Sequence, residues 1–204
     1  MVLKHDGTYN EEMYPDLVKE YKENFDFTWT GLLGFNDSYG LVVRKEIADK
    51  YNLKTYSDLA KVSENLVFGG EYDFFERPDG YDALCKKYNF KFKKTMDLDI
   101  GLKYKAIDEG KVDVMDIFTT DGQLSASDVV VLKDDKQFFS TAMGVMVIRD
   151  EILNKYPQLE DVFSEMEGIL NDDEMAKLNY MVETEGKDAE TVAHEYLMEI
   201  GLLK

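Results

Sequence analysis

The 204-residue sequence has little of the chemistry that builds disulfide-rich or metal-binding proteins. Its single cysteine, Cys85, excludes an internal disulfide and every site that needs paired cysteines. The two histidines, His5 and His194, lie at opposite ends of the chain and argue against a zinc site. We therefore expect neither a metal nor a cofactor. With only three prolines, the sequence also has no Pro-rich linker to mark a domain boundary.

Basic residues are scarce relative to acidic ones. The sequence has 24 Lys and Arg against 42 Asp and Glu, a formal net charge of −18. This balance argues against nucleic-acid binding, because a phosphate backbone is bound by clustered basic side chains. A hydrophobic content of 44%, with 13% aromatic residues, indicates a folded rather than a disordered chain. The length allows one large domain or two small ones.

Long apolar runs and catalytic motifs are also missing. No run approaches the roughly 20 apolar residues that span a bilayer. The first ten residues, MVLKHDGTYN, lack the apolar segment of a signal peptide, so we expect either a cytoplasmic protein or a chain without its targeting portion. The sequence has no G-x-S-x-G, H-E-x-x-H, Walker or G-x-G-x-x-G motif, and we do not expect an enzyme. A small hydrolase that uses a carboxylate pair stays a distant alternative.

The spacing of apolar residues predicts an α/β protein, because strands alternate with helices from Tyr39 to Leu132. Strands are expected at Phe27–Leu33 (interrupted by Gly31 and Gly34), Tyr39–Arg44, Leu66–Gly69, Lys91–Asp97, Val112–Phe118, Val129–Leu132 and Ala142–Ile148. Helices are expected at Met13–Phe25, Lys45–Tyr51, Ser57–Lys61 with Ser57 as N-cap, Asp79–Tyr88, and Ile100–Ile107 ended by Gly110.

After the last strand, the sequence predicts helices only. These are Glu151–Tyr156, Leu159–Leu170, Asp172–Thr184 and Asp188–Ile200, with Asn171 and Asp188 as N-caps. Two apolar stripes on the last two helices are expected to lie in the helix core: Met175, Leu178 and Met181, and then Val192, Tyr196, Leu197 and Ile200.

Three polar segments lie at strand ends, where α/β proteins bind their ligands. They are GFNDSYG (Gly34–Gly40), GGEYDFFERPDG (Gly69–Gly80) and FTTDG (Phe118–Gly122). Aromatic faces attract cations, and a guanidinium group binds a carboxylate through two parallel hydrogen bonds. The alternative interpretation is purely structural. In it, Tyr39 caps the core, Phe74 and Phe75 anchor their loop, and Arg77 pairs with Glu76 or Asp79.

Longer motifs carry a resemblance to a known family. The segments GFNDSYGLVVRKEIADKYNLKTYSDLA, FGGEYDFFERPDGYDAL, DIGLKYKAIDEGKVDVMDIFTTDGQL and VVLKDDKQFF follow one another in this order. Together they resemble the substrate-binding proteins of ABC importers for quaternary amines such as glycine betaine, carnitine and choline. The resemblance extends from Met1 to Lys204.

The resemblance implies a periplasmic-binding-protein-like (type II) clamp of two α/β lobes. Residues 37–139 would form one complete lobe, and residues 1–36 and 140–204 the C-terminal part of the other. Because lobes of this family begin earlier, the resemblance implies a fragment or the tail of a longer polypeptide. We expect such a fragment to self-associate, since an unpaired strand edge is a template for pairing.

The resemblance also assigns ligand-binding positions one by one. Tyr39 and Phe118 match positions of an aromatic cage around the ligand cation, and Arg77 matches the arginine that binds the ligand carboxylate. Ala142 stands where many members have a cage tyrosine, which leaves room for a bulkier betaine such as ergothioneine or carnitine. Residues expected to support these positions are Asn36, Tyr72, Thr120 and Asp121.

The implied function is capture of a quaternary amine outside the cytoplasm for an ABC permease and its ATPase. The protein would be associated with the cell membrane through a lipid anchor or a fused permease outside this sequence. A ligand-sensing regulatory domain of the same fold is the main alternative. It would need a DNA-binding helix pair, which these residues do not contain.

Overall fold

A computed structural model describes residues 11–203. The chain divides into two compact units. Unit 1 consists of the described part of Met1–Ser38 together with Ser140–Lys204, and unit 2 is Tyr39–Phe139. The first division falls after Ser38, two residues beyond the expected boundary at residue 36. His5 and the segment considered as a signal peptide lie outside the described residues.

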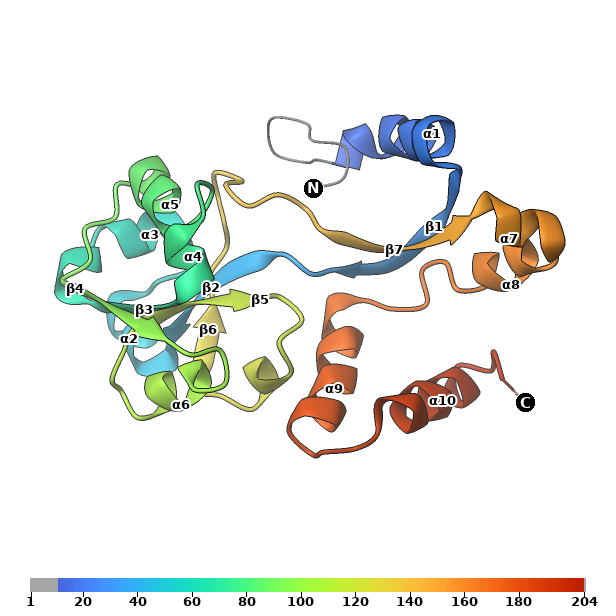
Figure 1. Cartoon of the computed structure of the whole chain (residues 1–204). Helices are drawn as coiled ribbons and strands as arrows, with labels where there is room; N and C mark the ends of the chain where they lie inside the picture. Colours follow the sequence, from blue (N-terminus) through green and yellow to red (C-terminus); the bar gives the residue numbers. More distant parts are fainter. Residues whose placement is uncertain (1–10, 204) are drawn as a thin grey trace. The chain divides into compact units, whose positions relative to one another are not determined.

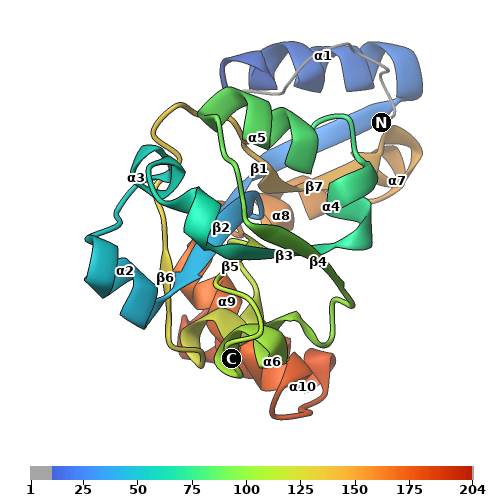
Figure 2. The same cartoon turned by 90° about the vertical axis from the view of Figure 1, so that its left-hand side faces the viewer.

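Unit 2 is built on a five-stranded mixed sheet in the order β4-β3-β5-β2-β6 (Figures 1 and 2). Its strands are β2 (Tyr39–Arg44), β3 (Val67–Glu71), β4 (Lys94–Leu98), β5 (Val114–Phe118) and β6 (Val129–Val131). Strand β3 is parallel to β4 and β5, whereas β2 is antiparallel to β5 and β6. Tyr39 is therefore paired with Phe118. The start of β2 thus lies at the same sheet edge as the end of β5.

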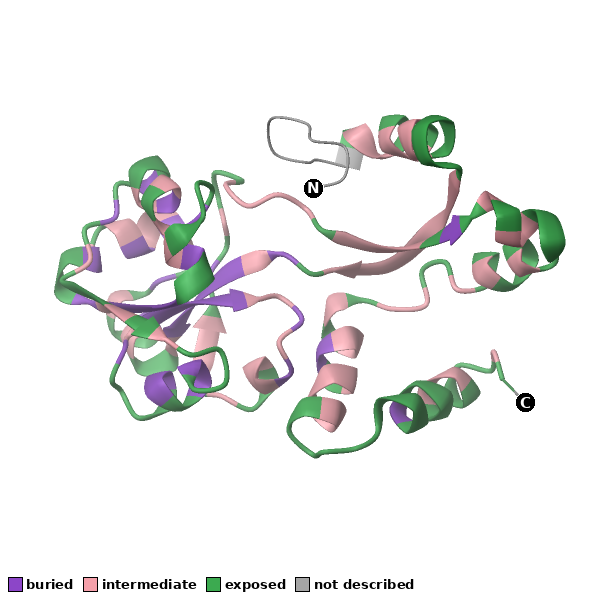
Figure 3. Cartoon of the chain, in the orientation of Figure 1, coloured by how far each residue is buried: buried purple, intermediate pink, exposed green. Residues whose placement is uncertain are grey.

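Helices cover both faces of this sheet. They are α2 (Lys45–Tyr51), α3 (Tyr56–Ala60), α4 (Tyr72–Glu76), α5 (Tyr81–Tyr88) and α6 (Lys103–Asp108), with short 3-10 turns at Ser63–Asn65 and Gly122–Ser125. Figure 1 shows α5 and α6 on opposite sides of the sheet. Leu41 and Val43 of β2 belong to one buried cluster and Val42 to the other, as strand alternation requires. Buried residues are concentrated in these strands and their helices (Figure 3).

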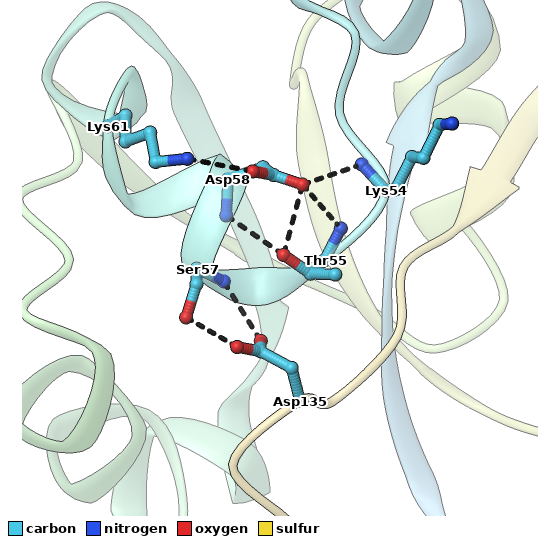
Figure 4. Close-up of polar contacts among 6 residues, drawn as sticks. All are labelled: Lys54, Thr55, Ser57, Asp58, Lys61 and Asp135. Atoms are coloured by element: carbon cyan, nitrogen blue, oxygen red, sulfur yellow. Dashed lines mark hydrogen bonds and ion pairs between the residues drawn. The ribbon is translucent and has the colours of Figure 1, made fainter.

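The N-cap of α3 differs from the expected one. Thr55, not Ser57, begins the helix: its hydroxyl accepts a hydrogen bond from the Asp58 N–H at 3.1 Å, and the Asp58 carboxylate accepts one from the Thr55 N–H at 3.2 Å (Figure 4). This capping box satisfies two backbone donors at once. Ser57 instead donates from its backbone and its hydroxyl to Asp135, at 3.1 and 2.6 Å.

Other boundaries in unit 2 also depart from the sequence expectation. A short helix, α4, occupies part of the segment Gly69–Gly80 that the sequence predicts to be a loop, and Phe74 of this helix is fully buried. Helix α6 begins at Lys103 rather than Ile100, and β4 begins at Lys94 rather than Lys91. Gly110 does adopt the predicted left-handed conformation, with φ +68°.

Unit 1 has a two-stranded antiparallel sheet of β1 (Phe27–Asn36) and β7 (Met143–Arg149). Its helices are α1 (Tyr14–Phe25), preceded by a 3-10 turn at Glu11–Met13, then α7 (Asp150–Lys155), α8 (Leu159–Ser164), α9 (Asp172–Glu183) and α10 (Ala189–Glu199). Strand β1 continues through Gly31 and Gly34, contrary to expectation, and the pairing register shifts near them instead. The predicted N-caps Asn171 and Asp188 are confirmed.

Helix α8 is shorter than the apolar spacing predicted. It ends at Ser164 instead of continuing to Leu170. Gly168 has φ +67°, and its N–H donates to the Leu32 carbonyl at 2.9 Å, while the Leu170 N–H donates to the Leu33 carbonyl at 3.1 Å. This segment therefore lies along β1. Main-chain bonds to the strand replace those that a longer helix would make.

The hydrophobic core of unit 1 is sparse. Among its described residues, the buried hydrophobic side chains are Ile148, Ala176 and Val192. The two apolar stripes of α9 and α10 are only partly buried: Ile200, which follows α10, is 40% exposed, and Met175, Leu178 and Met181 are half-buried. The expectation that these stripes form a helix core is therefore wrong for most of their residues, because the described chain has little to pack on them.

Candidate functional site

Aromatic rings cluster at the sheet edge where β2 begins and β5 ends. The Tyr39 and Phe118 ring centroids are 4.5 Å apart, a consequence of their paired register. The Tyr39 ring also lies 5.2 Å from Phe74 and 5.9 Å from Phe139. Partial burial raises the pKa of the Tyr39 hydroxyl, a shift that the charge of Arg77 opposes. Such ring faces carry the negative potential that attracts cations.

Arg77 lies beside this cluster, directly after α4. Its Cζ atom is 5.6 Å from the centre of the Tyr39 ring. Its Nε and Nη2 atoms donate to the two oxygens of Asp79, at 2.9 and 2.7 Å, which confirms the structural alternative for this arginine. The Arg77 and Asp79 side chains are 47% and 56% exposed, so the pair adds little to stability. Their mutual hydrogen bonds raise the pKa of Arg77 and lower that of Asp79.

The two phenylalanines before Arg77 anchor their segment, as the structural alternative predicts. Phe74 is fully buried and Phe75 packs against the same core cluster. Tyr72, at the start of α4, is 62% exposed. The helix therefore directs Phe74 inward and leaves Tyr72 in solvent.

A buried ion cluster supports the Phe118 side of the aromatic cluster. Lys103 is only 2% exposed, and its Nζ atom lies 2.6 Å from Glu71 Oε1 and 3.1 Å from Asp121 Oδ2. The same Nζ atom lies 5.5 Å from the centre of the Phe118 ring. Burial acts to lower the pKa of Lys103, but Asp121 and Glu71 outweigh it and the pKa is raised. Lys103 is therefore charged at neutral pH.

Asp121 also holds the turn that follows Phe118. Its Oδ2 atom accepts hydrogen bonds from the Phe118 N–H at 3.1 Å and from the Tyr104 hydroxyl at 2.9 Å. Thr120, in the same turn, is buried. Thr120 is therefore enclosed by protein, whereas the Asp121 side chain is 19% exposed.

A second turn positions Phe139, a residue that the sequence reasoning missed. Asp134 Oδ2 accepts hydrogen bonds from the N–H groups of Phe138 and Phe139, at 2.7 and 2.9 Å. The Tyr88 hydroxyl donates to the other Asp134 oxygen. The sequence feature that could have indicated this turn is the run DDKQFF, in which an aspartate precedes backbone N–H groups that its carboxylate can accept hydrogen bonds from. It places the Phe139 ring against Tyr39.

The two remaining candidates, Asn36 and Ala142, lie together in unit 1. The Ala142 N–H donates to Asn36 Oδ1 at 2.6 Å, and the Asp37 N–H donates to the Ala142 carbonyl at 2.9 Å. The Asn36 N–H donates to Asp172 Oδ1 at 2.7 Å. The structure thus joins Tyr39, Phe118 and Arg77 within unit 2, and Asn36 with Ala142 within unit 1.

The described residues contain no group of three His, Cys, Asp or Glu side chains arranged to hold a metal ion. No helix within residues 11–203 combines the length and the apolar character needed to cross a membrane. What unit 2 does offer is an aromatic edge next to a half-exposed guanidinium group. These groups can bind a cation and a carboxylate of one small molecule.

Comparison with known proteins gives the class of this chain, which is a substrate-binding domain. The chain belongs to the OpuAC family, the substrate-binding domain of ABC-type glycine betaine transport systems, whose model matches residues 7–199.

Individual relatives carry specific names. The chain is 43% identical, over 93% of its length, to the ergothioneine transport permease/ergothioneine binding protein EgtU of Helicobacter pylori, of which it spans 34%. It is 38% identical, over 92% of its length, to the carnitine transport binding protein OpuCC of Listeria monocytogenes, of which it spans 61%. The chain thus spans less than two thirds of each of these relatives.

A solved structure gives the fold independently. The crystal structure of a glycine betaine/carnitine/choline ABC transporter protein matches with a TM-score of 0.86 at 36% identity, over 95% of this chain and 72% of that one. YehZ from Escherichia coli, solved without ligand, matches with a TM-score of 0.75 at 25% identity, over 93% of this chain and 71% of that one. The predicted type II binding-protein fold class is confirmed.

Proposed function

We propose that this chain captures a zwitterionic quaternary-ammonium compound for an ABC importer, without catalysing a reaction. The observation that carries the proposal is the Tyr39–Phe118 ring pair, 4.5 Å between centroids, with the Arg77 guanidinium 5.6 Å from the Tyr39 ring. The rings would hold the ammonium group, and Arg77 would exchange its exposed partner Asp79 for the ligand carboxylate. Losing a surface ion pair costs about 0–1 kcal/mol, so this exchange is inexpensive.

Ala142 bears on which ligand is native. Its methyl group supplies no ring, and each desolvated cation–π contact contributes roughly 2 kcal/mol. We propose that the missing ring weakens glycine betaine and choline relative to a bulkier betaine such as carnitine or ergothioneine. The names of the Listeria and Helicobacter relatives support this order. Asn36, hydrogen-bonded to Ala142, and the turn residues Thr120 and Asp121 would support the site, with Tyr72 at its exposed margin.

The partners follow from the class. We propose that unit 2 is one complete lobe and unit 1 part of the other, and that the ligand drives closure by binding the closed state more tightly. An ABC permease and its ATPase would then receive the ligand. The protein would work outside the cytoplasm at the cell membrane, through a lipid anchor or a fused permease. The name of the Helicobacter relative, which joins permease and binding protein, supports the last arrangement.

Self-association is a further part of the proposal. Val147, Tyr156 and Val162 of unit 1 are 43%, 43% and 52% exposed, and an open strand edge can pair with another chain. Multi-angle light scattering on the 204-residue chain should show a dimer or larger species at micromolar concentration. A monomer at all concentrations would contradict this part alone.

The function is tested by isothermal titration calorimetry on the 204-residue chain with glycine betaine, carnitine, choline and ergothioneine. At least one of the four should release or absorb heat with a saturable isotherm. Absence of binding by all four would overturn the proposed function.

The role of Arg77 gives a sharper prediction. In Arg77→Ala, we expect the affinity for betaines with a carboxylate to fall by roughly 10- to 100-fold, because a hydrogen bond to a charged group contributes about 1.5–3 kcal/mol. Choline, which has no carboxylate, should change by less than about threefold by the same reasoning. Arg149→Ala is the matched control, since Arg149 is 63% exposed and pairs with Glu151 in unit 1. Equal losses for both ligand types would refute this role of Arg77.

A further inference from the structure

Asp116 is a buried carboxyl group that lacks a counter-ion of its own. It lies in the middle of β5 with 0% exposure. Its Oδ1 atom accepts one hydrogen bond, from the Glu71 N–H at 3.2 Å. Among the described residues, its Oδ2 atom has no hydrogen-bond partner. An unpaired buried carboxylate is costly, so a side chain in this state calls for a functional explanation.

The strand register places this carboxyl group directly behind the aromatic edge. Asp116 precedes Phe118 by two residues, so both side chains lie on the same face of β5. Its partner across the sheet is Leu41, which follows Tyr39 by two residues on β2. Asp116 therefore lies on the same face of the sheet as the Tyr39–Phe118 pair, two residues before Phe118 on β5.

The charges around Asp116 leave an excess of negative charge. Lys103 of α6 is paired with Glu71 of β3 and with Asp121 of the turn after β5. The net charge of these three groups is +1 − 2 = −1 before Asp116 is counted. Tyr39 of β2 also interacts electrostatically with Asp116. Burial raises the pKa of Asp116 to about 7; Lys103 opposes the shift and Glu71 adds to it. Near neutral pH, this carboxyl group therefore exists in both protonation states.

We propose that Asp116 stabilises the bound ligand electrostatically and loses its proton when a quaternary ammonium group binds at the Tyr39–Phe118 rings. The inference rests on the proposed function of this site. The O–H bond of the protonated Asp116 carboxyl breaks, the proton passes to solvent, and the carboxylate remains, with no covalent bond to the ligand. The ligand cation favours the ionised carboxylate, and the ionised carboxylate in turn favours the cation, because the coupling is reciprocal.

This coupling predicts the direction of the pH dependence. The cation lowers the pKa of Asp116 in the complex below its value in the free protein. Affinity should therefore be highest above about pH 7 and fall as the pH drops below it. Because the pKa of Asp116 in the free protein is about 7, lowering the pH from 8 to 6 can reduce the affinity by at most about tenfold, and we expect a loss of about three- to tenfold.

The test is calorimetry on the 204-residue chain, with the four ligands named above, at pH 7 in phosphate and in Tris. The difference between the two buffers measures proton release, because Tris takes up protons with much more heat. A group with a pKa near 7 should release roughly half a proton per ligand bound. In Asp116→Asn the release should vanish, and the affinity should no longer change between pH 6 and pH 8.

Two control variants isolate Asp116. Asp97→Asn changes an exposed aspartate on β4 of the same sheet and should leave the proton release intact. A variant with His5→Gln and His194→Gln should also keep it, which excludes a histidine as the source of the proton.

The outcomes separate this inference from the proposed function. Failure of all four ligands to bind overturns the function itself. Binding without proton release, or release that persists in Asp116→Asn, overturns only the role of Asp116. Carbon-detected NMR of the wild-type carboxyl groups needs no substitution and decides the matter if the variant does not fold. One aspartate should titrate near pH 7 in the free protein and at lower pH with ligand; no aspartate titrating above pH 6 would contradict the proposal.

Discussion

Single residues in unit 2 place charge where the sheet is otherwise apolar. Lys103, at 2% exposure, is compensated by two acidic partners, whereas Asp116 has one backbone hydrogen bond and an unpartnered oxygen. Burying ions is expensive and paired burial is often no better than apolar packing. Both side chains lie next to the rings that we propose as the ligand site. The unfavourable free energy of burying these two charged groups is therefore concentrated next to the proposed ligand site.

The raised pKa of Asp116 predicts a pH-dependent stability that needs no ligand. The folded state retains the Asp116 proton up to about pH 7, whereas an unfolded aspartate loses it near pH 4. This residue therefore makes the folded state less stable as the pH rises between these values. Relative to wild type, Asp116→Asn should gain roughly 2–3 kcal/mol of unfolding free energy between pH 5 and pH 7.5.

Urea unfolding at both pH values measures this gain. Asp97→Asn, on the same sheet but exposed, should show the pH dependence of wild type. If Asp116→Asn also keeps the wild-type slope, the carboxyl group is already ionised at pH 5 and its pKa is not raised.

At the scale of elements, turns and caps set the positions of the site residues. Phe139 is held by the Asp134 turn, Phe118 by the Asp121 turn, and α3 by the Thr55–Asp58 capping box. Each device satisfies backbone N–H groups with a carboxylate or hydroxyl oxygen. Asp134 and Asp121 thereby fix the backbone that carries Phe139 and Phe118.

The capping box predicts which of two neighbouring hydroxyl groups stabilises α3. Thr55→Ala should lower the free energy of unfolding by about 1 kcal/mol, because it removes the N-cap acceptor. Ser57→Ala, the matched control, should cost less than about 0.5 kcal/mol, because its backbone N–H still donates to Asp135. Urea denaturation of the two variants compares them, and a larger loss for Ser57→Ala would mean that the helix begins two residues later.

At the scale of the whole molecule, the two units differ in how much apolar surface they bury. Unit 2 has two buried clusters around its sheet, whereas the described part of unit 1 buries Ile148, Ala176 and Val192. Local stability follows the number of buried contacts around a backbone amide. The units should therefore differ in their resistance to opening.

Hydrogen exchange measured by mass spectrometry on the 204-residue chain checks this difference. Peptides covering β2 and β5 should exchange slowest, by at least about a hundredfold relative to β1 and β7, because a difference of a few kcal/mol in opening free energy corresponds to that factor. Adding a ligand that binds should slow exchange in the unit that contacts it. Equal protection of β1, β7, β2 and β5 in the free chain would contradict the prediction.

Much of the architecture could be predicted because it is local. The limits of β2 and α2 and the caps at Asn171 and Asp188 depend on alternation, helical spacing and hydrogen bonds to nearby residues. The path of β1 through Gly31 and the early end of α8 could not be predicted. They depend on β7 and on main-chain bonds between Gly168 and Leu32, residues far apart in the sequence.

The sequence by itself determined the α/β class and the family resemblance, and it singled out Tyr39, Arg77 and Phe118 as candidates, because these are carried by local patterns and ordered motifs. Only the tertiary structure decided that an antiparallel β2 sets Tyr39 against Phe118, that Asp79 occupies Arg77, and that Phe139 joins the rings. It also decided that Asp116 is buried without a counter-ion. The choice of Asp79 over Glu76 is made by local geometry, whereas pairing register, burial and the charges around Asp116 depend on residues brought together across the sheet, which no local pattern encodes.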